Sequence, residues 1–343
     1  MKNKINVLVV DDSLFIRNLI SRTILSFDNV CVDRAVNGLE ALEKLKLKKY
    51  DVVTLDVEMP KLDGLSTLEQ IMNTTKTPVV MISSYTRKDG DITIKALELG
   101  AVDFIEKPQR LIIPENKIAF EKEIREKVLA AAGSNLNQFT KRIIVPKIHS
   151  QETQKILLIG ASTGGPPCVE RILITLPEDY YLPVVLVQHM PGNFMIHFIN
   201  RLKSICQVNV KEARHGEALK KGTVYVCPGD HHIEIKKGID LYISLNQKPK
   251  EEYVRPCVNM MFRSAAAAAG KNVIGVVLTG MGKDGTDGAR AIKKNNGVVI
   301  AQDKATSMIY GMPKSIVDNN LADYVEPLGN IIKRVDLICR RKR

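Results

Sequence analysis

The sequence predicts an α/β protein made of two domains, each with a doubly wound parallel sheet. Short apolar runs alternate with amphipathic stretches, which is the pattern of the strand–helix–strand units that form parallel sheets. The length of 343 residues corresponds to about two domains of ordinary size. A polar, proline-containing segment over residues 133–152 interrupts the alternation. We therefore expect one domain over residues 1–132, a linker over 133–152, and a second domain over residues 153–343.

Four apolar runs predict strands of the first domain, at residues 5–10, 50–56, 78–83 and 101–105. Stretches with apolar residues at helical spacing predict its helices, near residues 13–26, 37–47, 63–73, 89–99 and 115–132. Gly133 follows the last of these stretches, and glycine is common directly after a helix.

The same alternation resumes after the predicted linker. Apolar runs predict strands at residues 155–160, 183–189, 223–228, 272–280 and 298–303. Helices are expected near residues 166–175, 194–204, 258–269, 285–296 and 313–319. Two further short runs within residues 232–244 predict a hairpin inserted into this second domain.

The composition favours an ordinary globular protein, with 45% hydrophobic and 26% charged residues. No apolar run reaches the ~18 residues needed to cross a bilayer, and the first residues lack a signal-peptide pattern. The six cysteines are widely spaced without a CxxC pair, which disfavours a zinc site or a disulfide framework. We expect a cytoplasmic protein that does not insert into membranes. The net charge of +12 leaves a nucleic-acid partner open on charge alone.

Acidic side chains follow two predicted strands of the first domain. Asp11 and Asp12 end the first strand and Asp56 ends a later one, and carboxyl ends of parallel strands meet at one edge of a sheet. Crowded carboxylates need a cation, and oxygen ligands suit Mg²⁺. Ser83 and Lys107 end two further strands and add a hydroxyl and a positive charge. Any one acidic group could be a turn former, but together the five groups predict phosphoryl transfer onto Asp56.

The segments VVDDS, TLDVEMPKLDG, PVVMISS and GAVDFIEKP resemble the receiver domain of response regulators, which has a flavodoxin-like fold. The resemblance implies that Asp56 is the phosphoacceptor. It also implies that Asp12, Asp56 and the carbonyl group of Glu58 are Mg²⁺ ligands, with Asp11 close by in the same acidic pocket.

The resemblance to receiver domains further implies a set of switch residues. Ser83 and Lys107 are expected to contact the phosphoryl group, and Phe104 is the expected switch aromatic. A cis peptide bond between Lys107 and Pro108 is also expected, although only ~5% of such bonds are cis in folded proteins.

The second domain contains a candidate nucleophile. Residues 160–164 read GASTG, which matches G-x-S-x-G and places Ser162 at a turn from a strand to a helix. His189 ends the next strand and is the candidate base, since a serine hydroxyl needs a group that takes its proton. Asp284 follows a third strand and is the candidate acid that orients the histidine. Asp287 and Asp303 are rival acids.

A dinucleotide-binding site is a weaker reading of the same strand, glycine loop and helix. The motif G-x-G-x-x-G requires glycine where Ser162 stands, and an acidic residue should end the next strand, where Gln188 and His189 stand instead. The order Ser162, His189, Asp284 also differs from that of α/β-hydrolases, so the match to G-x-S-x-G supports only the local turn.

The segments IGASTGGP, VQHMP, YVCPGDHH, RPCVNMMFRSAA, VVLTGMGKDG and AQDKATSMIYGMP resemble the catalytic domain of the CheB family, the chemotaxis protein-glutamate methylesterases. The resemblance implies Ser162 as nucleophile, His189 as base, Asp284 as acid, and the backbone N–H of Met281 in the oxyanion hole. It implies no cofactor in this domain. Asn259 stands where the family more often has aspartate.

The two resemblances together imply a phosphorylation-activated hydrolase of bacterial chemotaxis. Its expected substrates are glutamate methyl esters on the cytoplasmic helices of chemoreceptors, with deamidation of glutamines as a second reaction. A chemotaxis histidine kinase is the expected phosphoryl donor. Two other readings are weighed. A DNA-binding output is disfavoured because the second domain has no helix-turn-helix pattern, and a catalytically dead docking module is disfavoured by the intact Ser, His and Asp.

Overall fold

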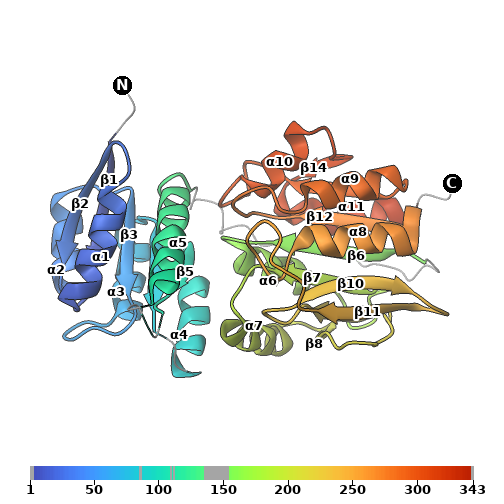
Figure 1. Ribbon diagram of the computed structural model, residues 1–343, viewed down its shortest axis with the longest axis horizontal. Coiled ribbons are helices and arrows are strands. Elements are labelled where there is room, and N and C mark those ends of the chain that lie inside the picture. The colour runs from blue at the N-terminus through green and yellow to red at the C-terminus, as the bar shows by residue number, and fades with distance from the viewer. Residues whose placement is uncertain (1–3, 85–86, 109, 111–112, 135–153, 341–343) are drawn as a thin grey trace. The chain divides into compact units, whose positions relative to one another are not determined.

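A computed structural model describes residues 4–84, 87–108, 110, 113–134 and 154–340. The chain divides into two compact units, Met1–Leu136 and Asn137–Arg343, and each is an α/β structure with a parallel sheet (Figure 1). Most of the predicted linker, residues 135–152, lies outside the described residues.

The first unit has one five-stranded parallel sheet in the order β2-β1-β3-β4-β5. Its strands are β1 (Ile5–Val10), β2 (Val30–Ala35), β3 (Val52–Asp56), β4 (Val79–Ser83) and β5 (Asp103–Glu106). This order is that of the flavodoxin-like fold, which confirms the predicted class. The central strands β3 and β4 are fully buried, whereas the edge strand β2 is mostly half-buried and was not predicted.

Helices cover both faces of this sheet. They are α1 (Leu14–Leu25), α2 (Gly38–Leu47), α3 (Gly64–Thr74), α4 (Arg87–Glu98) and α5 (Pro114–Ala132). Helix α1 packs beside α5, while α3 contacts both α2 and α4 (Figure 1). Three helices begin at polar caps, because Ser13, Asn37 and Asp63 each accept a hydrogen bond from an N–H group of the following turn.

The second unit has a seven-stranded parallel sheet in the order β14-β13-β12-β6-β7-β9-β8. Its strands are β6 (Ile156–Ala161), β7 (Val184–Gln188), β8 (Asn209–Glu212), β9 (Thr223–Val226), β12 (Val273–Val277), β13 (Val298–Gln302) and β14 (Tyr324–Glu326). The chain builds the sheet outward from β6 in one direction and from β12 in the other. The topological switch point therefore lies between β6 and β12, where α/β proteins form their ligand sites.

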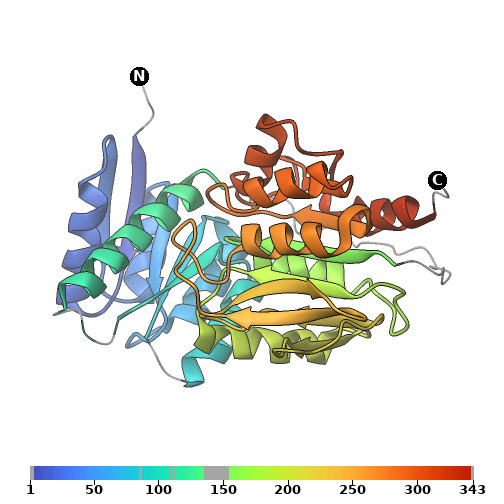
Figure 2. The same ribbon diagram turned by 45° about the vertical axis from the view of Figure 1, so that its right-hand side comes forward.

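The helices of this unit are α6 (Gly165–Leu173), α7 (Gly192–Ile205), α8 (Val258–Ala269), α9 (Thr286–Lys294), α10 (Met312–Asp318) and α11 (Ile331–Arg340). The predicted hairpin is confirmed as the antiparallel pair β10 (His232–Lys237) and β11 (Leu241–Asn246). It lies beside α8 (Figures 1 and 2), where the N–H of Ile235 donates to Ser264 at 3.0 Å. Ile233, Ile235 and Ile243 of the hairpin join the core around α8.

Candidate functional site

The acidic cluster of the first unit forms at the carboxyl ends of its strands. One carboxylate oxygen from each of Asp11, Asp12 and Asp56 lies within 4.8 Å of the others. Asp11 and Asp56 are buried, whereas Asp12 is exposed. Lys107 reaches the same place from the end of β5, with its Nζ 2.9 Å from Asp11 and 2.7 Å from Asp56. Strand ends that are far apart in sequence thus bring together three negative charges and one positive charge.

Burial dominates the acid–base behaviour of this cluster. It raises the pKa of the Asp56 carboxyl to about 7, with the charge of Lys107 opposing the shift and the charge of Asp11 adding to it. Burial also raises the pKa of Asp11. For Lys107, burial is outweighed by the two carboxylates, so that its pKa is raised and it stays charged. One lysine does not balance three carboxylates, and oxygen donors at this spacing could hold a divalent cation.

The other predicted residues of this unit lie around the cluster. Ser83, at the end of β4, is buried and its hydroxyl accepts a hydrogen bond from Thr93 at 3.2 Å. Phe104 of β5 is also buried, with the Lys127 Nζ 5.2 Å from its ring centroid. Glu58 follows β3 by two residues, and its side chain is exposed.

The expectation of a cis bond between Lys107 and Pro108 is wrong. In the described residues the cis peptide bond is Arg255–Pro256, and the bond before Pro108 is not cis. Trans is the more common form of a bond before proline. With the bond in this form, the Lys107 ammonium group reaches both Asp11 and Asp56.

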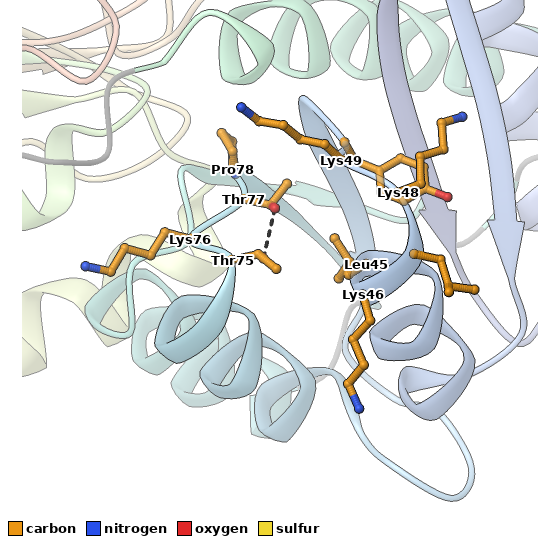
Figure 3. A pocket seen from close by; sticks show the side chains of 10 residues that line it. Leu45, Lys46, Lys48, Lys49, Thr75, Lys76, Thr77 and Pro78 are labelled. Carbon is orange, nitrogen blue, oxygen red and sulfur yellow. Dashed lines mark hydrogen bonds between the residues drawn. The ribbon is translucent and has the colours of Figure 1, made fainter.

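A pocket of the first unit lies where α2 leads into β3 and α3 leads into β4, away from the acidic cluster (Figure 3). Its lining includes four lysines, namely Lys46, Lys48, Lys49 and Lys76. Lys48 pairs with Asp33 at 2.7 Å. Cations near the carboxyl ends of helices stabilise the helix dipole, which explains the lysines without a ligand.

In the second unit, Ser162, His189 and Asp284 lie side by side around the topological switch point. The Ser162 Oγ is 3.1 Å from the His189 Nδ1, and the His189 Nε2 is 2.8 Å from the Asp284 Oδ2. The three residues follow β6, β7 and β12, which are neighbours in the sheet. The arrangement is the hydrogen-bonded order of a nucleophile, a base and an orienting acid.

The turn that carries Ser162 depends on two close approaches. Gly164 has a φ of +70°, and a Cβ on it would lie 2.7 Å from the Cβ of Met308. A Cβ on Gly280 would lie 2.7 Å from the Cβ of Ser162 itself. Helix α6 then begins at Gly165, whose N–H donates to the Ser162 carbonyl at 2.7 Å. Its positive dipole end is therefore next to the hydroxyl.

The two rival acids do not approach His189 in the way that Asp284 does. Asp287 is exposed on α9 and pairs with Arg290. Asp303 accepts hydrogen bonds from the backbone and hydroxyl groups of Thr306 and so stabilises its own turn.

Asp284 is buried, with 3% of its surface exposed. Its carboxylate caps α8, because it accepts hydrogen bonds from the N–H groups of Val258 at 2.7 Å and Asn259 at 2.9 Å, in the first turn of that helix. Burial opposes ionisation, but the hydrogen bond and charge of His189 together with these N–H groups outweigh it and lower the pKa of Asp284. The carboxylate therefore stays charged.

Some backbone N–H groups near Ser162 have no acceptor among the described residues and could bind an oxyanion. The N–H of Ser162 donates to the Thr279 carbonyl, and that of Gly280 donates to the Ile309 carbonyl. Those of Met281 and Thr163 donate to no acceptor within the part of the chain that the structure describes. Thr163 was not singled out from the sequence, although the residue after the nucleophile commonly supplies such a donor in G-x-S-x-G turns.

The folds and the two clusters define a class of protein in which an acidic phosphoacceptor-type pocket is joined to a Ser-His-Asp hydrolase-type site. The family models agree: a response regulator receiver domain matches residues 7–113, and a CheB methylesterase matches residues 157–335. The chain belongs to the CheB methylesterase family.

Relatives match this chain over nearly its whole length. A protein-glutamate methylesterase/protein-glutamine glutaminase of Lawsonia intracellularis is 42% identical, covering 96% of this chain and 98% of the relative. One of the same name from Pyrococcus horikoshii is 41% identical, covering 98% and 95%. The crystal structure of the Thermotoga maritima CheB methylesterase catalytic domain has 41% identity and a TM-score of 0.53, covering 55% of this chain and 100% of that one. No helix among the described residues is long and apolar enough to cross a membrane.

Proposed function

We propose that this protein hydrolyses glutamate methyl esters on the cytoplasmic helices of chemoreceptors, releases methanol, and also deamidates glutamines there. The observation that carries the proposal is the chain of two hydrogen bonds from Ser162 through His189 to Asp284 at the switch point of the sheet. The names of the full-length relatives supply the substrate class. The reaction belongs to the cytoplasm, where these receptor helices lie.

The geometry of the three side chains supports a distinct role for each of them. In the proposed mechanism the neutral ring of His189 carries its proton on Nε2, and this N–H donates a hydrogen bond to Asp284. The Nδ1 atom can then accept the proton of the Ser162 hydroxyl. The Ser162 oxygen attacks the ester carbonyl, and the resulting oxyanion is bound by the N–H groups of Met281 and Thr163. His189 then protonates the departing methanol, and an acyl-enzyme remains.

A water molecule completes the cycle. His189 takes its proton, the hydroxide attacks the acyl carbonyl, and the Ser162 oxygen leaves with the proton from Nδ1 while glutamate is released. For a glutamine substrate the same steps release ammonia in place of methanol. General-base help of this kind is worth about 10²–10⁴-fold, and each oxyanion donor about 10²–10³-fold.

The receiver unit is proposed to accept a phosphoryl group on Asp56 from a chemotaxis histidine kinase. Asp12, Asp56 and the Glu58 carbonyl would hold Mg²⁺, with Asp11 beside them, and the bound ion would neutralise charge on the phosphoryl oxygens. Lys107 is already 2.7 Å from Asp56 and supplies a second positive charge. The Ser83 hydroxyl is proposed to contact the phosphoryl group, and the Phe104 ring is proposed to change position with it. These changes in the receiver unit are proposed to activate the hydrolase.

The domain boundaries proposed for this scheme remain residues 1–132 for the receiver, 133–152 for the linker and 153–343 for the esterase. The receiver and esterase family matches fall inside the outer two ranges.

Methanol release from methylated receptor membranes, with and without acetyl phosphate and Mg²⁺, tests the proposed function. We expect release by the wild-type chain, none above background for Ser162→Ala, and no increase with acetyl phosphate for Asp56→Asn. A phosphonate ester that labels Ser162, followed by mass spectrometry, tests the chemistry without the receptor. A wild-type chain that neither labels nor releases methanol would be a docking module, and the proposal would be wrong.

A further inference from the structure

The carboxylate of Asp284 has more hydrogen-bond donors than its contact with His189 requires. Its Oδ1 atom, which does not face the histidine, accepts from the Cys257 thiol at 3.1 Å, the Asn259 N–H at 2.9 Å and the Gly285 N–H at 2.8 Å. With the two donors on Oδ2, five groups surround a carboxylate that offers about four lone-pair positions. The surroundings of Asp284 therefore fix how its plane is turned.

The donors come from a reciprocal arrangement of two helices. Cys257 stands at the N-cap of α8 but makes no capping hydrogen bond, and Asp284, just before α9, caps α8 in its place. In return the Asn259 side chain of α8 accepts the N–H of Gly288, in the first turn of α9, at 2.8 Å. A Cβ on Gly288 would lie 2.5 Å from the Cβ of Phe262, so the two helices are in close contact.

The Cys257 thiol is suited to act as a donor here. Its residue is fully buried, and burial together with the negative charge of Asp284 raises the pKa of the thiol, which keeps it protonated. Apart from His189, it is the side chain that donates to Asp284 within the described residues, since the other donors are backbone N–H groups. Substitution of Cys257 can therefore remove this donor while the backbone donors stay in place.

We propose that Cys257 is a positioning residue of the hydrolytic site, which holds Asp284 so that its Oδ2 atom stays directed at His189 Nε2. Asn259 supports the same orientation by tying α8 to α9. Neither residue is proposed to touch the substrate. The inference rests on the proposed function, because its consequence is measured in the hydrolytic reaction.

Three substitutions at position 257 separate the hydrogen bond from the packing. Cys257→Ser keeps a donor, Cys257→Ala removes both the donor and volume, and Cys257→Val removes the donor but fills the space. Cys227→Ala is the matched control, because it removes another fully buried thiol whose contacts are the carbonyls of Pro228 and His231. For each variant, phosphonate labelling of Ser162 counts intact active sites, and kcat, KM and the pH profile are then expressed per labelled site.

We expect Cys257→Ala and Cys257→Val to lower kcat per site by about five- to twentyfold with little change in KM. The acid limb of the pH profile should move to higher pH, because a carboxylate that has lost one donor attracts the protonated imidazole more strongly. Cys257→Ser should restore most of both parameters, and Cys227→Ala should leave them near the wild-type values.

The pH profile of these variants depends on the titratable groups around Asp284 and Cys257. Within the described residues, the titratable or charged side chains that interact with Asp284 or with Cys257 and its surroundings include His189, His232, Glu251, Arg255 and Arg263. Burial is the main cause that lowers the pKa of His232, which favours its neutral form.

A purely structural role for Cys257 would reduce the number of labelled sites but leave kcat per site and the acid limb unchanged, and that result would overturn the proposal. Equal values for the serine, alanine and valine variants would overturn it as well. Failure of the proposed function looks different, because the wild-type chain itself would then release no methanol.

Discussion

At the scale of single residues, the two ring nitrogens of His189 have separate partners. Nδ1 faces the Ser162 hydroxyl and Nε2 faces the buried Asp284, which stays ionised because the α8 N–H groups and the histidine offset its burial. An ionised Asp284 favours the tautomer that carries the ring proton on Nε2, the side away from Ser162. In that tautomer Nδ1 can accept the proton of the Ser162 hydroxyl, as the proposed mechanism requires.

Asp284→Asn is predicted to lower kcat by about 10³–10⁴-fold. The amide cannot accept hydrogen bonds on both sides, so its NH₂ group would face either His189 and the Val258 N–H, or the N–H groups of Asn259 and Gly285. The melting temperature should therefore fall too. Ester hydrolysis and thermal unfolding measure the two effects. Asp287→Asn, on an exposed acid paired with Arg290, is the control and should behave like the wild type. Retention of more than a tenth of kcat by Asp284→Asn would contradict the proposed role.

Asp56→Asn is predicted to stabilise the receiver unit near pH 8 in the absence of Mg²⁺. The pKa of Asp56 is raised to about 7 in the folded protein, so the folded state holds its proton after the unfolded chain has lost it. Stability linked to this group is thus full below the unfolded pKa of 3.8 and is lost as the pH rises to about 7. The gain on substitution should be ~1–3 kcal/mol, reduced by the lost contact with Lys107.

Calorimetry with and without Mg²⁺ measures this effect. Mg²⁺ should raise one unfolding transition of the wild-type chain, and Asp56→Asn should raise the same transition without responding to the ion. An unchanged or lower transition for Asp56→Asn at pH 8 would show that burial of the charge is not costly.

At the scale of helices and strands, the sequence is most informative where an element is buried. The apolar runs that became β3, β4, β6, β7 and β12 were predicted, and so were the candidate residues at their ends. The short or edge strands β2, β8 and β14 were missed, because half-exposed strands carry a mixed pattern of polar and apolar residues. Helix α11 was missed as well.

The support around the triad could not be predicted from the local pattern. Ser162, His189 and Asp284 each follow a strand, and strand ends meet at one edge of a sheet. Cys257 and Asn259 instead reach Asp284 because α8 packs on α9, a contact between segments about 25 residues apart that no local motif encodes.

Gly64→Ala is predicted to destabilise the receiver unit and to reduce its phosphorylation by acetyl phosphate. Helix α3 begins at Gly64, which lies against the end of β3 that carries Asp56. A Cβ on Gly64 would lie 2.0 Å from the Asp56 carbonyl oxygen, so the backbone must shift. The loss should exceed ~1 kcal/mol. Calorimetry and phosphoprotein gels measure the two effects.

Gly133→Ala is the matched control for this substitution, since its Cβ would meet nothing closer than 3.7 Å. Ser162 labelling should be normal in both variants. A Gly64→Ala chain with wild-type stability and phosphorylation would show that α3 can move away at no cost.

At the scale of the whole molecule, both units use the same structural solution for different chemistry. Each places its reactive side chains at the carboxyl ends of neighbouring parallel strands, with Asp11 and Asp56 in one sheet and Ser162 and His189 in the other. The chain that carries them has a net charge of +12, which would favour encounter with the receptor helices of the proposed function if these are acidic.

Raising the salt concentration is therefore predicted to raise KM for receptor membranes severalfold between ~50 and ~500 mM NaCl, with little change in kcat. The charges in question are spread over the surface and are screened, whereas the triad is mostly buried. Labelling of Ser162 by an uncharged phosphonate is the control and should not depend on salt. A KM that is flat across this range would mean that charge does not guide the encounter.

The double use of Asp284 has a consequence for how relatives are interpreted. Because this side chain also terminates a helix, a descendant that had abandoned ester hydrolysis would still be under pressure to retain it for the sake of folding. The Ser162 hydroxyl has no comparable second duty within the part of the chain that the structure describes, since its hydrogen bond is with His189. Loss of the serine at position 162 is thus the informative marker of an inactive homologue. Retention of the aspartate at position 284 does not show that a homologue is active.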